Sequence, residues 1–168
     1  MRWSVLCRLE IPYLPTPEDV ALRMLELAKP LRGELLVDLG CGDGRILILA
    51  SRLYGCRCVG YEVDDNLIRE ALRNIRGMGI RNVRVLRRDL FKADISEADI
   101  LTLYLTPKAL EVLSGRIVRE MRNGARIVSH DYEVPGLKPL MVDYVETHGI
   151  HTHKIYLYKI PDSIVSYG

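Results

Sequence analysis

Hydrophobic and polar positions along this 168-residue chain follow two periods in turn, and these periods predict alternating strands and helices. Short runs that are apolar on both faces are typical of buried strands in a parallel sheet. Between them, apolar residues recur every three or four positions, as on the inner face of an amphipathic helix. Strands are expected at residues 34–39, 57–62, 83–89, 99–105 and 125–129, and helices at residues 17–28, 45–54, 65–76 and 107–122.

The chain beyond residue 130 follows a different pattern. Residues 141–146 and 154–160 are two strand-like runs with no long helix between them, which predicts an antiparallel pair at an edge of the sheet. The first five strands alternate with helices and therefore predict an α/β fold, a doubly wound parallel sheet with right-handed crossovers and helices on both faces. The length and the 48% hydrophobic content suit a single domain over residues 1–168.

Residues that flank the predicted helices are typical of helix ends. Thr16 precedes Pro17 and two acidic residues, so Thr16 is expected to cap the first long helix. Asp65 is expected to cap the helix that Gly77 ends.

The run from Leu36 to Arg45 places an acid, a glycine turn and a helix start at the end of the first strand. Its glycines have the spacing G-x-G-x-G, and Arg45 stands where a dinucleotide fingerprint needs a third small residue, which disfavours NAD. A Walker loop is excluded because no Gly-Lys-Ser/Thr follows Gly40 at the required distance. Asp38 would repel phosphates and favours a ligand with a positive group. S-adenosylmethionine, which carries an ammonium and a sulfonium but no phosphate, fits this corner.

Two further acids follow the next two strands. Glu62 ends the second strand about 20 residues beyond the turn, a distance that places an acid on a ribose in a βαβ unit. We expect Glu62 to accept hydrogen bonds from both ribose hydroxyls, and Asp89, at the end of the third strand, to accept one from the adenine amine. Each acid alone is equally typical of a helix cap or a surface charge, but three strands ending in three acids around a glycine turn form a specific constellation.

At these residues the chain resembles the class I S-adenosylmethionine-dependent methyltransferases, whose cofactor positions are matched by Asp38, Gly40, Gly42, Glu62 and Asp89. The resemblance covers nearly the whole chain and implies a seven-stranded Rossmann-like sheet of order 3-2-1-4-5-7-6, with strand 7 antiparallel.

Residues 11–17, 128–134 and 153–158 are also similar to the small archaeal protein-lysine methyltransferases and to the related mitochondrial methyltransferases that act on a component of ATP synthase. This narrower resemblance implies a protein substrate that presents lysine, and it implies that the segment with Tyr13 and Thr16 packs across the cofactor. Thr16 would then help to hold the methionine carboxylate. The expected cofactor site is completed by Cys41, Val63 and Leu90.

Acceptor chemistry is expected at the end of the fourth strand, because methyl transfer is an in-line displacement in which the protein mainly aligns the acceptor. The segment lacks the Asn/Asp-Pro-Pro-aromatic set that holds a nucleobase amine, and its mostly apolar character suits the long stem of a lysine. Tyr104 and Thr106 are the catalytic candidates, although Tyr104 is equally typical of a core ring. His130 with Asp131 is a weaker candidate for a base, because lone histidines near strand ends are more often structural.

Three alternatives compete with a lysine acceptor. Arginines are dense between residues 69 and 88, as in an RNA-binding stripe, but interleaved acids, a missing aromatic platform and a net charge of +2 favour an ordinary solvated face. A small-molecule methyltransferase, for instance one acting on a tetrapyrrole precursor, would also be compact. A cofactor-binding scaffold without activity is disfavoured because it would need none of the intact acids.

The remaining composition favours a reduced, aqueous compartment. Cys7, Cys41, Cys56 and Cys58 are scattered and Cys-x-Cys is not a usual zinc pair, so free thiols and no metal site are expected. No apolar run approaches the roughly 18 residues that span a bilayer, and the N-terminus lacks a secretory apolar region. We therefore expect a cytoplasmic protein without membrane insertion.

Overall fold

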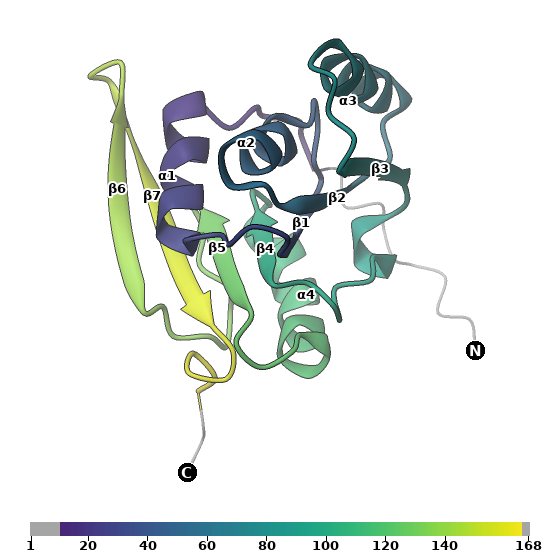
Figure 1. Ribbon diagram of the computed structural model, residues 1–168. Helices are drawn as coiled ribbons and strands as arrows, with labels where there is room; N and C mark the ends of the chain where they lie inside the picture. Colours follow the sequence, from purple (N-terminus) through teal and green to yellow (C-terminus); the bar gives the residue numbers. More distant parts are fainter. Residues whose placement is uncertain (1–10, 166–168) are drawn as a thin grey trace, which may run out of the picture.

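The computed structural model describes residues 11–165, in which a seven-stranded sheet lies between helices on both of its faces (Figure 1). The strand order is β3-β2-β1-β4-β5-β7-β6, as the family resemblance implied. The strands are β1 (Leu35–Leu39), β2 (Arg57–Glu62), β3 (Val83–Arg87), β4 (Ile100–Leu103), β5 (Arg126–His130), β6 (Met141–Thr147) and β7 (His151–Lys159). The helices are α1 (Glu18–Ala28), α2 (Arg45–Tyr54), α3 (Asp65–Gly77) and α4 (Pro107–Glu120), with a 3₁₀ turn, η1, at Leu90–Lys92.

Alternate residues of the central strands pack into two separate hydrophobic cores, one on each face of the sheet. Leu36 and Ile100 pack with the inner faces of α1 and α2, whereas Val37 and Leu101 pack with α4. Because successive strand residues point to opposite faces, strands that are apolar at every position must be covered on both sides. This confirms the doubly wound arrangement that the apolar runs predicted.

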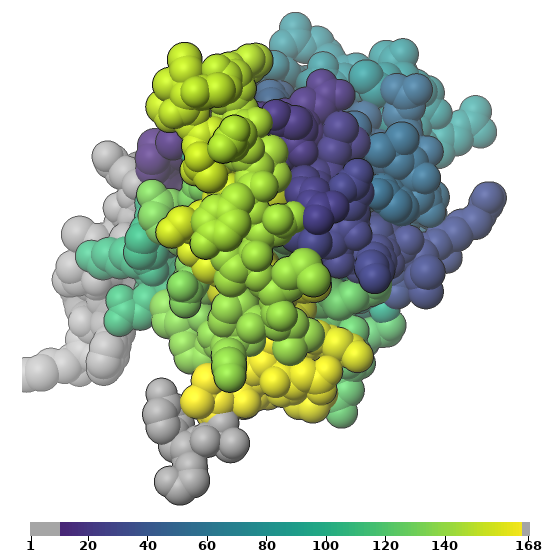
Figure 2. All heavy atoms as spheres, turned by 90° about the vertical axis from the view of Figure 1, so that its left-hand side faces the viewer, coloured from purple at the N-terminus to yellow at the C-terminus, as the bar shows by residue number. Residues whose placement is uncertain are grey.

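The antiparallel part of the sheet is the hairpin of β6 and β7. β7 pairs antiparallel with β5 and with β6, while the pairs among β1 to β5 are parallel. Figure 2 shows the hairpin, in yellow and yellow-green, beside the purple α1. Arg23 Nε of α1 donates a hydrogen bond to Asp143 Oδ2 of β6 at 2.6 Å, which ties the edge strand to the helical layer.

Two predicted helix caps are wrong. α1 starts after Pro17 without a side-chain cap, and the Thr16 hydroxyl instead lies 3.5 Å from His130 Nδ1. α3 is capped by Asp64, whose Oδ1 accepts from the backbone N–H groups of the second and third residues that follow it, and not by Asp65, which pairs with Arg87. The residue with the extended backbone before a helix takes the cap, and composition alone does not locate it.

Two strands are shorter than expected at their carboxyl ends. β3 ends at Arg87, so Asp89 lies in the following turn, and β4 ends at Leu103, so Leu105 lies in the loop before α4. In both places the chain leaves the sheet at the edge where the cavity described below opens.

The cysteines within residues 11–165 are buried free thiols, as expected, and Cys7 lies outside the described residues. None of the helices in this part of the chain combines the length and apolar character required to cross a membrane.

Candidate active site

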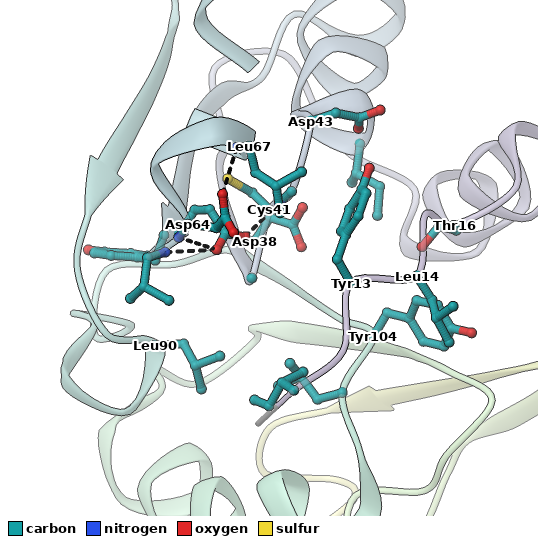
Figure 3. A pocket seen from close by; sticks show the side chains of 18 of the residues that line it. Tyr13, Leu14, Thr16, Asp38, Cys41, Asp43, Asp64, Leu67, Leu90 and Tyr104 are labelled. Carbon is teal, nitrogen blue, oxygen red and sulfur yellow. Dashed lines mark hydrogen bonds between the residues drawn. The ribbon is translucent and has the colours of Figure 1, made fainter. Parts of the chain in front are cut away.

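The carboxyl ends of the parallel strands open into a cavity of about 910 Å³, within the size range of small-molecule and cofactor sites (Figure 3). One wall is the segment of residues 11–16, called the N-terminal strap below; the others come from residues 40–46, residues 61–64 with 88–92, and Tyr104 with Leu105. The residues expected to bind cofactor or acceptor all line this cavity except Thr106, and they include the three acids.

The glycine loop is shaped by positive backbone φ angles and close neighbours. Gly42 has φ +54°, and a Cβ there would lie 2.5 Å from a ring carbon of Tyr13. Beneath the loop, a Cβ on Gly60 of β2 would lie 2.5 Å from Cys41 Sγ, so this strand glycine makes the space in which the Cys41 side chain is buried. Burial raises the pKa of the Cys41 thiol, which keeps it protonated. Cys41 is one of the residues that line the cavity.

Asp38 is a buried acid at the floor of the cavity. The residue is only 4% exposed, and Oδ1 accepts a hydrogen bond from Thr102 Oγ1 at 2.9 Å. Burial raises the pKa of Asp38 to about 7, against the opposing effect of the Thr102 hydrogen bond. Such a carboxylate is stabilised by a cationic group placed beside it. Thr102 is a supporting residue that sequence reasoning did not identify.

Glu62 is held by three backbone donors. Oε2 accepts from Gly42 N at 3.0 Å, and Oε1 accepts from Val63 N at 2.8 Å and from Asp64 N at 3.0 Å. The carboxylate therefore has a fixed position between the glycine loop and the start of α3, and Oε2, which accepts from one donor, keeps a lone pair for a further donor.

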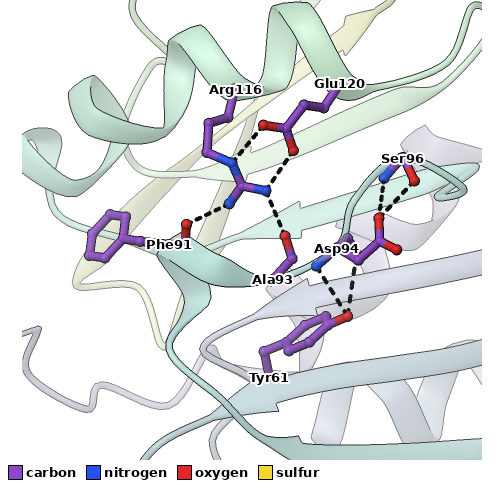
Figure 4. A network of polar contacts seen from close by, with 7 residues as sticks. All are labelled: Tyr61, Phe91, Ala93, Asp94, Ser96, Arg116 and Glu120. Carbon is purple, nitrogen blue, oxygen red and sulfur yellow. Dashed lines mark hydrogen bonds and ion pairs between the residues drawn. The ribbon is translucent and has the colours of Figure 1, made fainter.

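Asp89 and Leu90 are positioned by contacts from the opposite face of the sheet. Asp89 Oδ1 caps η1 by accepting from Phe91 N at 2.9 Å. Arg116 of α4 donates to the carbonyl oxygens of Phe91 at 2.7 Å and Ala93 at 2.6 Å (Figure 4). One side chain thus holds two carbonyl oxygens of the turn that follows the third acid.

The N-terminal strap is fastened to the glycine loop by Arg45. Arg45 Nη1 donates to the carbonyl oxygen of Thr16 at 2.8 Å, and Arg45 Nη2 pairs with Asp43 at 2.6 Å. The Tyr13 ring lies over the glycine loop, between Asp43 and Thr16 (Figure 3). From the sequence, Arg45 served only as evidence against an NAD site. A cation at the N-terminus of a helix is disfavoured by the helix dipole, and this was a signal that Arg45 contacts a distant segment.

The two catalytic candidates differ in their surroundings. Tyr104 lines the cavity, and its ring stacks on His130 with centroids 3.8 Å apart. Thr106 is outside the lining residues, and its hydroxyl caps α4 by accepting from Ala109 N at 3.4 Å.

His130 is buried behind Tyr104 and belongs to a cluster with Asp131 and His153. Burial lowers the pKa of His130 to about 4, so the imidazole is neutral at pH 7 and is a weak acceptor for the proton of an ammonium group. Sequence reasoning considered His130 with Asp131 but did not bring in His153, which is 23 residues away.

Residues 38–141 match the ANTKMT methyltransferase domain. The chain belongs to this methyltransferase family. A protein-lysine N-methyltransferase of Saccharolobus islandicus is 42% identical over 152 residues, which cover 89% of this chain and 94% of the relative. The adenine nucleotide translocase lysine N-methyltransferase of Mus musculus is 31% identical over 93% of this chain and 66% of its own length. The human lysine N-methyltransferase of the ATP synthase c-subunit is 27% identical over 84% and 59%, respectively.

Solved structures of methyltransferases share the fold. An RNA methyltransferase from Salinibacter ruber in complex with S-adenosyl-L-homocysteine is 39% identical, with a TM-score of 0.83 over 92% of this chain and 98% of that chain. A precorrin-6y C5,15-methyltransferase from Geobacter metallireducens, 19% identical with a TM-score of 0.71 over 87% and 90%, shares the fold alone. The family and the complex with the spent cofactor confirm that this chain is an S-adenosylmethionine-dependent methyltransferase.

Proposed function

We propose that this methyltransferase transfers methyl groups to lysine side chains of proteins. The observation that carries the proposal is the 42% identity, over nearly the whole of both chains, to the protein-lysine N-methyltransferase of Saccharolobus islandicus. The relatives named as lysine methyltransferases of protein substrates in mouse and human add to this support.

The cavity residues fit S-adenosylmethionine, which when bound supplies an electrophilic methyl group on its sulfonium. Asp38 is a buried, partly protonated acid whose ionised form is stabilised by a neighbouring cation, and the positive end of the cofactor would supply that cation. Glu62 would accept from the ribose hydroxyls, and Asp89 from the adenine amine. The remaining contacts are assigned to the residues around these acids: Tyr13, Thr16, Gly40, Cys41, Gly42, Val63 and Leu90.

The acceptor would approach past Tyr104, beside the apolar side chain of Leu14 (Figure 3). Leu105 adds a second apolar side chain to the lining of the cavity. A lysine has a reference pKa of about 10.4, so holding its amine neutral at pH 7 requires roughly 4–5 kcal/mol. An apolar approach and a neighbouring sulfonium both lower that pKa, and no strong base is then required. We retain Tyr104, which lines the cavity, as the acceptor-contacting residue, and not Thr106, whose hydroxyl caps α4.

A labelling experiment tests the acceptor. The purified protein is incubated with methyl-labelled S-adenosylmethionine and a cell lysate, and the labelled polymer is divided between protease and nuclease treatments. We expect protease-sensitive label that mass spectrometry assigns to lysine side chains. Label that survives protease and is released by nuclease would refute the lysine proposal.

A second candidate, RNA methylation, is supported by the 39% identity to the RNA methyltransferase from Salinibacter ruber. Arginines on the exposed face of α3, namely Arg69, Arg73 and Arg76, would serve as a backbone-binding stripe. Nuclease-sensitive label in the same experiment, with binding that weakens steeply as salt rises, is the outcome that this candidate requires.

A further inference from the structure

Three potential metal ligands converge where β5 meets β7, on the far side of Tyr104 from the cofactor cavity. His130 ends β5, Asp131 follows it, and His153 lies in β7. His130 Nε2 is 2.9 Å from His153 Nδ1, His153 Nδ1 is 3.2 Å from Asp131 Oδ2, and His130 Nε2 is 3.3 Å from the same Asp131 oxygen. Each pair of atoms is therefore in contact, and the three atoms form a nearly equilateral triangle.

Hydrogen bonding alone does not satisfy this triangle. The carboxylate brings no proton, so the only hydrogens come from the two ring nitrogens. If both rings donate to Asp131, two N–H groups face each other across the 2.9 Å contact of His130 with His153. If only one ring nitrogen is protonated, the other points a lone pair at the carboxylate. At least one side of the triangle is thus repulsive unless a cation lies among the three atoms.

The dimensions of the triangle suit a tetrahedral zinc ion. Zinc lies about 2.0–2.1 Å from histidine nitrogen and carboxylate oxygen, so two ligand atoms at tetrahedral angles are about 3.3–3.4 Å apart. The observed separations of 2.9, 3.2 and 3.3 Å approach this value without moving a backbone element. Two histidines and one carboxylate form a donor set that zinc uses with a fourth, open position.

Neighbouring groups hold the three ligands in place. Asp131 has a backbone φ of +63°, and its second oxygen, Oδ1, accepts from Lys154 N at 3.0 Å. The far nitrogen of His130, Nδ1, faces the Thr16 hydroxyl at 3.5 Å, which allows Nε2 to present its lone pair. The His130 side chain is fully buried, whereas those of Asp131 and His153 are 26% and 17% exposed, so an ion and a fourth ligand from solvent can reach the site.

We propose that His130, Asp131 and His153 bind one divalent transition-metal ion, with zinc as the expected occupant. Calcium and magnesium are disfavoured because they require six or more mainly oxygen ligands. The ion would connect the β5–β7 junction with two groups of the cofactor cavity, the ring of Tyr104 and the hydroxyl of Thr16. The site is independent of which polymer accepts the methyl group.

The test uses protein purified without a histidine tag and stripped with a chelator. Calorimetric titration with ZnCl₂ should give one equivalent of saturable binding, and Co²⁺ should give the strong visible absorption of a four-coordinate site. Loss of a group that only hydrogen-bonds to a metal ligand typically weakens metal binding by roughly 10–100-fold. His153→Ala and Asp131→Asn each remove a ligand and should weaken zinc binding by more than this. Thr16→Val should weaken binding within that range.

Two exposed histidines of the same hairpin provide matched controls. His148→Ala and His151→Ala should leave the zinc affinity unchanged, because neither belongs to the cluster. Circular dichroism verifies that each variant is folded, and Asp131→Asn keeps the shape of its side chain. Absence of stoichiometric zinc binding by the folded protein, or an equal loss in the His151→Ala and His153→Ala variants, would overturn the proposal.

Discussion

Replacing Asp38 by asparagine separates the stability of the empty protein from its affinity for the cofactor. Burial raises the pKa of Asp38 from 3.8 to about 7, so the folded protein keeps a proton that the unfolded chain loses between about pH 4 and pH 7. The folded state therefore loses stability as the pH rises through this window. The shift corresponds to a loss of up to ~4 kcal/mol.

Asparagine has the shape of aspartate, keeps an oxygen that accepts from Thr102, and carries no charge at any pH. In the absence of cofactor at pH 8, Asp38→Asn should therefore be more stable than the unaltered protein by up to ~4 kcal/mol. At about 2–4 °C per kcal/mol, the melting temperature should rise by up to ~16 °C. Near pH 4 the difference should vanish, because both side chains are then neutral.

Cofactor binding should change in the opposite direction. The variant should bind S-adenosylmethionine at least ~100-fold more weakly, since loss of one partner of a buried charge pair costs about 3–5 kcal/mol. In the unaltered protein, affinity should fall about tenfold per pH unit below pH 7, because the proton on Asp38 must leave before the cation binds.

The assay is thermal unfolding at pH 4 and pH 8, combined with calorimetric titration of the cofactor at pH 8. Asp162→Asn, an exposed acid outside the cavity, is the matched control and should change neither quantity. A destabilised Asp38→Asn protein at pH 8 with unchanged cofactor affinity would refute the assignment of a buried, charge-seeking carboxyl group.

Three further substitutions test separate parts of the site. Glu62→Gln should weaken cofactor binding by ~10–100-fold in calorimetry, because a charged hydrogen-bond acceptor is worth about 1.5–3 kcal/mol; unchanged affinity would remove the ribose assignment. Gly60→Ala should lower the free energy of unfolding by about 1–3 kcal/mol in denaturant titration, since its Cβ would enter occupied space. The control Gly77→Ala, with open space around the Cβ, should raise that free energy by ~0.4–1 kcal/mol, and equal effects at both positions would contradict the packing argument. Tyr104→Phe should keep the ring stack but reduce kcat by about tenfold or more with little change in cofactor Kd, because only the hydroxyl is lost; an unaltered kcat would show that this hydroxyl does not contact the acceptor.

The strands and the three acids were predictable because the signals are local. Each parallel strand is an apolar run, and each acid stands next to the carboxyl end of its own run. Parallel pairing then brings Asp38, Glu62 and Asp89 to one edge without any knowledge of side-chain contacts.

The features that were missed depend on contacts between distant segments. Thr16 has the residue type of a cap, but its hydroxyl lies beside His130, which is 114 positions away. His153 joins the metal-ligand cluster only through the antiparallel pairing of β5 with β7. The sequence shows that Gly60 is a glycine inside a strand. It does not show why a glycine is required there, because the need arises from the packing of the Cys41 side chain against β2.

The bond from Arg45 to the Thr16 carbonyl has a kinetic consequence. This hydrogen bond joins the N-terminal strap to the glycine loop, and a strap held in this way would lose less conformational entropy when a ligand binds beneath it. Where the strap covers bound cofactor, exchange of spent for fresh cofactor would require this contact to open. The dwell time of the product under Tyr13, rather than the displacement at the methyl carbon, would then set the pace of successive turnovers.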